Sequence, residues 1–90
     1  MANIEIYTKS WCPFSVRATA DLDRRGISYR EIDVTSDTVR EAEMRERAGR
    51  HTVPQIFVDG HHVGGSDDLR DALANGDFDR LLAGEAPAEA

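Results

Sequence analysis

The sequence predicts an α/β protein in which a small four-stranded mixed sheet carries helices on both faces. Stretches of alternating polarity, typical of strands, are separated twice by stretches with apolar residues at helical spacing. Two strands joined through a helix run parallel, so we expect a parallel first pair. An Asp59-Gly60 pair between two apolar stretches predicts a β-hairpin, which adds antiparallel strands at one edge. At 90 residues the chain can build one modest core.

The first strand and the first helix are predicted from the spacing of apolar residues, which changes from alternation to helical spacing. Residues 3–8 alternate between apolar and polar side chains and predict a strand with its isoleucines on one face. Residues 12–26 predict a helix: Pro13 suits the first turn, where its missing N–H is not needed, and Gly26 is a stop signal. The apolar stripe of this helix is expected to consist of Phe14, Ala18 and Leu22.

The middle of the chain repeats this order. Residues 27–34 alternate and predict a second strand. Residues 35–50 predict a second helix, capped by a Ser or Thr near its start and ended by Gly49. Residues 53–65 predict the two short strands of the hairpin.

Helices complete the predicted domain. Residues 66–76 predict a third helix with Ser66 as its cap and two aspartates in its first turn, where they complement the helix dipole. Residues 77–84 predict a short final helix. We therefore expect one domain over residues 1–84, followed by a disordered acidic tail at residues 85–90.

Composition excludes several classes of function. The formal net charge of −6 argues against nucleic acid as a partner. No apolar run approaches the ~20 residues of a membrane span, and the first residues lack the basic and apolar regions of a signal peptide. We therefore expect a monomer in the cytoplasm, where thiols stay reduced. A chain with one cysteine forms no internal disulfide, so this thiol is structural, reactive or shared between molecules.

Cys12 lies between the first strand and the first helix, in the stretch KSWCPFS. Ligands of open α/β sheets bind at the carboxyl ends of strands, so the topology places the thiol at the expected site. The helix N-terminus, the nearby Lys9 and the N–H groups of Phe14 and Ser15 would favour the thiolate form, and the Ser15 hydroxyl could also donate to the sulfur. The alternative is a buried, inert cysteine, but such a residue is more typical of an apolar run.

Two further stretches fit a peptide ligand. A cis bond between Val53 and Pro54 would leave the main-chain groups of Val53 free to bind an extended peptide, whereas the alternative is an ordinary proline at a strand start. The stretch GGSDD, residues 64–68, lets a backbone approach a ligand and offers helix N–H groups to a carboxylate. Asp67 could accept from an ammonium group, although a plain capped helix is the alternative here.

The stretches IYTKSWCPFS, TVPQIFVDG and HVGGSDDL, in this order and at this spacing, resemble the glutaredoxin family, and most closely its small bacterial glutaredoxin 3 type. The likeness extends from Asn3 to about Leu82. It implies a thioredoxin-like fold with the element order β-α-β-α-β-β-α and a glutathione-dependent thiol-disulfide oxidoreductase. Glutathione would be the co-substrate, and the partners would be proteins that carry glutathione mixed disulfides or other disulfides.

The resemblance also implies roles for individual residues. Cys12 would be the nucleophile and Pro54 the cis-proline. Main-chain groups of Thr52 and Val53 would hold the cysteinyl part of glutathione, and Lys9 would pair with its glycine carboxylate. The γ-glutamyl end would be held by Gly65, Ser66 and Asp67, and the groove would be lined by Pro13 and Phe14.

Two departures from the family pattern affect the expected mechanism. Most relatives of this type carry a second cysteine at the position of Ser15, and many carry another at Ser66. Without a resolving thiol the mechanism is monothiol; Ser15 is either native or an engineered replacement, and the dithiol character of the rest slightly favours the latter. Glu41 occupies the place of a residue that often binds the glycine carboxylate and would repel it, so we expect the adjacent Arg40 to substitute.

A single active cysteine is compatible with other functions. Some monothiol relatives hold a [2Fe–2S] cluster between two subunits, with one cysteine from each and two glutathiones, although Trp11 and Pro13 would hinder cluster assembly here. A non-catalytic interaction module is a third alternative. No spacing of histidine, cysteine and carboxylate residues supports a zinc site, so we expect no metal.

Overall fold

The computed structural model of the chain describes residues 2–85 and contains one four-stranded sheet. The strands are β1 (Ile4–Thr8), β2 (Arg30–Asp33), β3 (Gln55–Val58) and β4 (His61–Gly64). They lie in the order β2-β1-β3-β4. β1 runs parallel to β2, while β3 is antiparallel to both β1 and β4. The expected parallel first pair and antiparallel edge are therefore confirmed.

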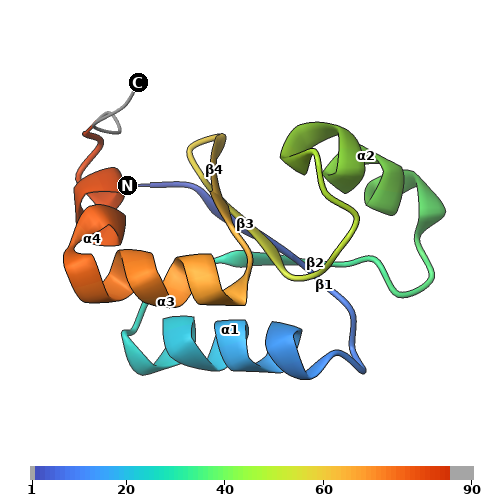
Figure 1. The fold of residues 1–90 in the computed structure, drawn as a ribbon, viewed down its shortest axis with the longest axis horizontal. Helices are drawn as coiled ribbons and strands as arrows, with labels where there is room; N and C mark the ends of the chain where they lie inside the picture. The colour runs from blue at the N-terminus through green and yellow to red at the C-terminus, as the bar shows by residue number, and fades with distance from the viewer. Residues whose placement is uncertain (1, 86–90) are drawn as a thin grey trace.

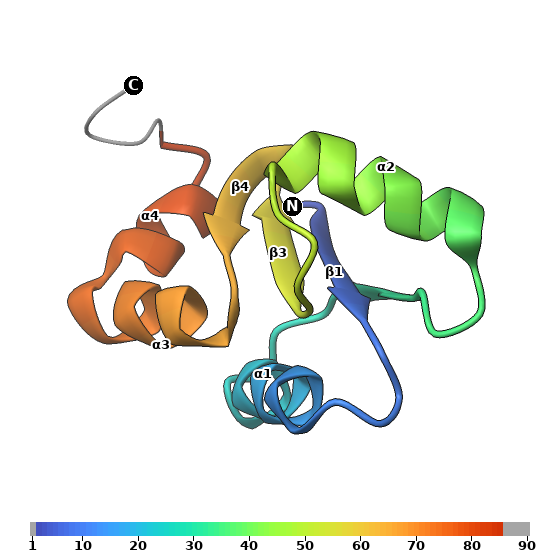
Figure 2. The ribbon, with the colours of Figure 1, turned by 45° about the vertical axis from the view of Figure 1, so that its right-hand side comes forward.

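Helices cover both faces of this sheet, as predicted. They are α1 (Pro13–Arg24), α2 (Thr38–Ala48), α3 (Ser66–Asn75) and α4 (Asp77–Leu82). α1 and α3 lie side by side on one face with α4 beside α3, and α2 lies on the opposite face (Figures 1 and 2). The predicted hairpin is confirmed: β3 and β4 pair antiparallel on either side of the turn. The turn residues Asp59 and Gly60 have φ angles of 50° and 82°, the left-handed conformation that a tight hairpin requires.

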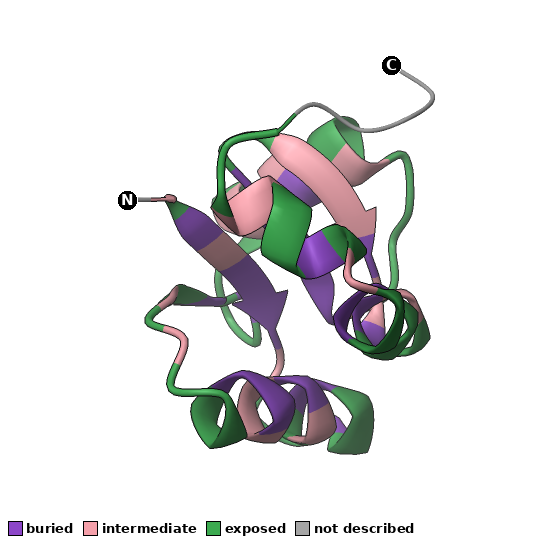
Figure 3. Ribbon diagram, turned by 90° about the vertical axis from the view of Figure 1, so that its left-hand side faces the viewer, coloured by how far each residue is buried: buried purple, intermediate pink, exposed green. Residues whose placement is uncertain are grey.

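Each face of the sheet has its own apolar core, and the buried residues follow the strands and the inner sides of the helices (Figure 3). Alternation along β1 directs Ile4 and Ile6 toward α1 and α3, and Tyr7 toward α2. The larger core consists of Ile4, Ile6, Ala18, Leu22, Ile56, Val58, Leu69, Ala72, Leu73 and Phe78. The smaller core consists of Tyr7, Ile32, Val34, Met44 and Phe57.

Two details differ from the prediction: the apolar face of α1 and the residue at which β2 begins. Phe14 is exposed, and the buried face of α1 begins at Ser15, whose hydroxyl accepts a hydrogen bond from a backbone N–H of the preceding loop. Since neighbouring helix positions point in different directions, an inward Ser15 leaves Phe14 outside the core. β2 begins at Arg30 rather than at residue 27, because the chain first turns back on α1: the Ile27 N–H donates to the Leu22 carbonyl at 3.1 Å.

The predicted Ser and Thr caps of α2 and α3 are wrong. α2 is capped by Asp37, whose carboxylate accepts from a first-turn N–H at 3.0 Å. The nearby Thr35 is already bonded to the carboxylate at the end of β2. α3 is capped by Gly65, and Ser66 is its first helical residue, so the Ser66 hydroxyl is available for other contacts.

Every helix within residues 2–85 is too short or too polar to cross a lipid bilayer. Nearly all of the predicted acidic tail, residues 86–90, lies outside the described residues. The expected domain boundary at residue 84 therefore stays a prediction.

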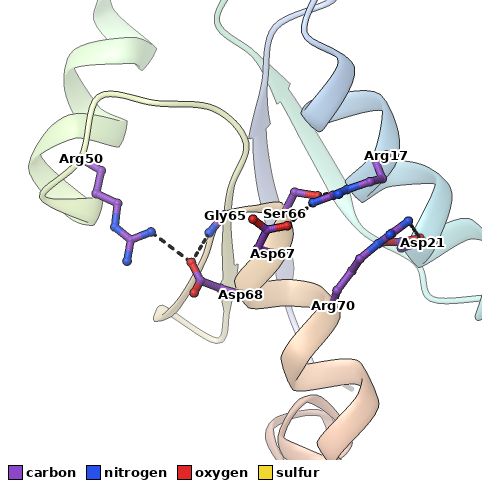
Figure 4. A network of polar contacts seen from close by, with 8 residues as sticks. All are labelled: Arg17, Asp21, Arg50, Gly65, Ser66, Asp67, Asp68 and Arg70. Atoms are coloured by element: carbon purple, nitrogen blue, oxygen red, sulfur yellow. Dashed lines mark hydrogen bonds and ion pairs between the residues drawn. The ribbon is translucent and has the colours of Figure 1, made fainter.

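A carboxylate between α1 and α3 joins the two helices on this face. Asp21 is only 6% exposed, and it accepts from Arg70 Nε at 2.9 Å (Figure 4). It also accepts from Arg24. The hydrogen bond from Arg70, opposed in part by burial, lowers the pKa of Asp21 below its ordinary value. Asp21 therefore links α1, whose N-cap residue is Cys12, to α3, which begins at Ser66.

We predict that Asp21→Asn lowers the free energy of unfolding by about 1–3 kcal/mol at neutral pH, because two guanidinium groups lose a charged acceptor. A lowered folded-state pKa stabilises the fold above the unfolded value of about 3.9, and this contribution is lost as the pH falls through the folded value. The difference between variant and wild type should therefore shrink below about pH 4 in urea denaturation. Asp71→Asn, an exposed change on α3, is the control; an equal effect from both substitutions would contradict the prediction.

Candidate active site

Cys12 is the N-cap residue of α1, with an extended backbone (φ −83°, ψ 117°) and Pro13 as the first helical residue. The side chain is largely sheltered, with 7% of the residue exposed, and its Sγ donates to the Val53 carbonyl oxygen at 3.6 Å. The sulfur thus lies at the start of a helix, against the loop that precedes β3. The amide donation to the sulfur expected from Phe14 and Ser15 is not found: Cys12 makes no side-chain cap hydrogen bond to the first turn of α1, because its Sγ is directed at the Val53 carbonyl.

The loop before Cys12 is closed by two short-range hydrogen bonds. The Cys12 N–H donates to the Lys9 carbonyl at 3.1 Å, and the Lys9 N–H donates to Ser15 Oγ at 3.3 Å. Ser15 is 2% exposed, so its hydroxyl belongs to the inside of this loop. The expectation that the Ser15 hydroxyl donates to the sulfur is therefore replaced by a structural role, in which it accepts from the backbone.

The loop that faces the sulfur is held by a buried amide. The Val53–Pro54 bond is cis, as the resemblance implied. The side-chain N–H of Gln55 donates to the Thr52 carbonyl at 3.1 Å, and Gln55 Oε1 lies 2.7 Å from His62 Nε2 on β4. Burial lowers the pKa of His62, which favours a neutral ring against this amide. Gln55 therefore fixes the position of Thr52 and Val53 relative to β4.

Two glycines bring the start of α3 against the same loop. Gly64 has a φ of 125°, and a Cβ at this position would lie 2.3 Å from Asp68 Oδ2. A Cβ on Gly65 would lie 3.5 Å from the Pro54 carbonyl oxygen. The Asp68 carboxylate accepts from the Gly65 N–H at 2.9 Å, which closes the first turn of α3. Gly64 is therefore required for both its backbone conformation and the close approach of Asp68.

These segments enclose a groove of about 250 Å³. Cys12 is not among its lining residues, but its sulfur contacts Val53, which is. Most of the predicted binding residues line it, together with two that the sequence analysis did not single out, Arg50 and Asp68. The lining residues are Phe14, Arg50, Thr52, Val53, Pro54, Gly65, Ser66, Asp67 and Asp68. Within residues 2–85, no group of three or more histidine, cysteine, aspartate or glutamate side chains could hold a metal ion.

The charged side chains at the α3 end of the groove are paired with one another (Figure 4). Arg17 of α1 donates through Nε to Ser66 Oγ at 2.7 Å and through its terminal nitrogen to Asp67 Oδ1 at 2.5 Å. Arg50 donates to Asp68 Oδ2 at 3.1 Å from the opposite side of the groove. Both predicted α3 contacts, Ser66 and Asp67, are thus already occupied by an arginine that sequence reasoning missed.

The predicted cations Lys9 and Arg40 are paired as well, and neither lines the groove itself. Lys9 Nζ lies 3.0 Å from Glu41 Oε2 and 5.8 Å from the centroid of the exposed Trp11 ring. The expected approach of the Lys9 ammonium to the sulfur is therefore replaced by an ion pair with α2. Arg40 pairs with Glu43 at 3.0 Å.

Comparison with known proteins agrees with this geometry. The sequence model of the glutaredoxin family matches residues 4–63. Glutaredoxin 3 of Escherichia coli is 49% identical to the chain over 82 residues, which cover 91% of this chain and 99% of that protein.

Solved structures show the same architecture. Glutaredoxin from Brucella melitensis, 43% identical, superposes with a TM-score of 0.82 over 97% of this chain and 96% of its own. A buckwheat glutaredoxin–glutathione complex, 24% identical, has a TM-score of 0.81 over 91% of this chain and 77% of its own and supports the fold alone. The expected thioredoxin-like fold is confirmed, and by sequence and structure the chain belongs to the glutaredoxin family.

Proposed function

We propose that the chain reduces glutathione mixed disulfides by a monothiol mechanism in which Cys12 is the nucleophile. As a glutaredoxin, the chain is a glutathione-dependent thiol-disulfide oxidoreductase. The observation that supports the proposed mechanism is the position of the lone thiol: Cys12 is the N-cap residue of α1, and its Sγ lies 3.6 Å from the carbonyl of Val53, a residue that lines a groove of about 250 Å³.

The reaction consists of two thiolate exchanges. In the first, the Cys12 thiolate attacks the glutathione sulfur of a mixed disulfide; a new disulfide forms between Cys12 and glutathione, and the substrate sulfur leaves as a thiolate that takes up a proton. In the second, a glutathione thiolate attacks the glutathione sulfur bound to Cys12. Oxidised glutathione is released, and the Cys12 thiolate is restored. One disulfide is reduced, and two glutathione sulfurs become one disulfide.

The groove supplies recognition for both exchanges. We assign the cysteinyl part of glutathione to the main chain of Thr52 and Val53 beside Pro54, because these groups lie nearest the sulfur. The γ-glutamyl end is assigned to the start of α3, where helix N–H groups suit its carboxylate. The α3 contacts are Gly65, Ser66 and Asp67. Phe14 also lines the groove, whereas Pro13, which was expected to do so, is not among its lining residues.

The glycine end of glutathione is assigned to Lys9, which lies outside the lining of the groove, with Arg40 as the second cation. The substrates follow from the chemistry: they are proteins that carry a glutathione mixed disulfide or another exposed disulfide. We propose that the chain acts as a monomer in the cytoplasm, where a large pool of reduced glutathione can drive the second exchange.

Replacing the nucleophile should abolish the adduct and the activity together. Incubation with oxidised glutathione should add the mass of one glutathionyl group to the wild-type chain, and excess reduced glutathione should remove it. Cys12→Ser should show neither mass gain nor turnover above the uncatalysed exchange, because no other residue of the chain is a cysteine. Glutathione mixed disulfides should be followed by mass spectrometry and a coupled assay; retained activity in the variant would refute the proposal.

A thiol at position 15 should add the missing resolving step. Positions 12 and 15 are separated by one turn at the start of α1, within reach of a disulfide. With stoichiometric disulfide substrate and no glutathione, reduced Ser15→Cys should release both substrate thiols and acquire an internal disulfide. The wild type should stall as a covalent mixed disulfide on a non-reducing gel. The exposed Ser28→Cys is the control; complete release of the substrate by the wild type would contradict a monothiol mechanism.

A further inference from the structure

The ion pair between Lys9 and Glu41 lies beside the reactive loop. Lys9 Nζ is 3.0 Å from Glu41 Oε2, and both side chains are mostly sheltered, with 22% and 20% of their surfaces exposed. The backbone of Lys9 is bonded to Cys12 and Ser15, so the point from which its side chain starts is fixed relative to the sulfur. A carboxylate that approaches Lys9 must therefore compete with the carboxylate of Glu41.

The pair at the other end of the groove is weaker. The partner of Arg17, Asp67, has 87% of its side chain exposed, so water and salt screen this contact strongly. The sheltered Lys9–Glu41 pair is less screened, and a ligand gains less by replacing one of its members. Arg45 lies 3.7 Å from Glu41 but is more than half exposed. The Lys9–Glu41 pair is therefore harder for a charged ligand to displace than the Arg17–Asp67 pair at the α3 end of the groove.

We propose that Glu41 is a specificity-determining residue that selects glutathionyl groups by the charge at their C-terminal end. It disfavours the free glycine carboxylate of glutathione and favours a glycyl end that is neutral or cationic, as in an amide or amine conjugate. This inference rests on the proposed function, in which the groove binds the glutathionyl group of a mixed disulfide and Lys9 faces its glycyl end.

Glu41 remains charged throughout the range in which the exchange chemistry operates. The hydrogen bond from Lys9, the largest influence, lowers the pKa of Glu41 below its ordinary value, although desolvation opposes it. Because a lowered carboxyl pKa extends the charged form to lower pH, Glu41 carries its charge at neutral pH. The competition with a substrate carboxylate is thus a permanent property of the site.

The test compares two substrates with a single difference in charge. One is the mixed disulfide of glutathione with a cysteine-containing reporter peptide, and the other is the same disulfide made from glutathione amidated at its C-terminus. We expect Glu41→Gln to raise kcat/KM for the free carboxylate by about three- to tenfold, the range of a partly sheltered ion pair. The amide should change by less than about twofold, because it carries no charge at this end.

Two further variants separate a local effect from a general one. Glu46→Gln removes the same charge from an exposed position of α2 and should leave the ratio of the two substrates unchanged. In a double-mutant cycle, Glu41→Gln should lose its effect when Lys9 is also replaced by Gln, because the competition acts through Lys9. Circular dichroism and thermal unfolding of each variant verify that the fold is retained.

The possible failures are distinguishable. If the wild type turns over neither disulfide and acquires no glutathionyl mass on Cys12, the proposed function is wrong, and this inference is wrong with it. If the wild type is active but Glu41→Gln alters both substrates equally, or Glu46→Gln reproduces its effect, the proposed function stands and the role of Glu41 is overturned. Discrimination that persists without Lys9 also overturns it.

Discussion

The site depends on the close approach of three backbone segments at one end of the sheet. The start of α1 brings Cys12 Sγ to the carbonyl of Val53, and the start of α3 brings Gly65 against the carbonyl of Pro54. Both helices are tied further along by the charged contacts of Asp21. The contact of the sulfur with the Val53 carbonyl and the approach of Gly65 to the Pro54 carbonyl both involve backbone groups, so the fold itself builds this part of the site.

The charges around the groove are satisfied within the protein. Each candidate contact for a charged part of glutathione already has an internal partner: Asp67 has Arg17, and Lys9 has Glu41. Binding of a zwitterionic ligand is therefore an exchange of ion pairs, in which each new contact is offset by the loss of an old one. Such a groove suits a substrate that must bind, react and leave. It also means that the internal partners, as much as the direct contacts, determine which ligand is preferred.

Patterns local in sequence predicted most of the fold, whereas side-chain contacts over long sequence separations were missed. The alternation in β1, the turn at Asp59 and the proline at position 13 each reflect a local constraint and were read correctly. The sequence analysis did not predict the arginine contacts. Arg17 and Ser66 are 49 positions apart, and only folding brings them together. The two missed groove residues did have a local signal: Arg50 lies two residues before Thr52, and Asp68 lies within the recognised stretch GGSDD.

Ser15 couples the architecture of the loop to the chemistry. Its buried hydroxyl accepts from the Lys9 N–H, a bond that the weaker acceptor sulfur of a cysteine would make less well. The serine that leaves the chain without a resolving thiol therefore also stabilises the loop that carries Lys9. In the proposed mechanism, the adduct on Cys12 would persist until a second glutathione arrives, because no resolving thiol can release it. Recognition at its glycyl end, where Lys9 meets Glu41, consequently bears on the lifetime of the intermediate as well as on its formation.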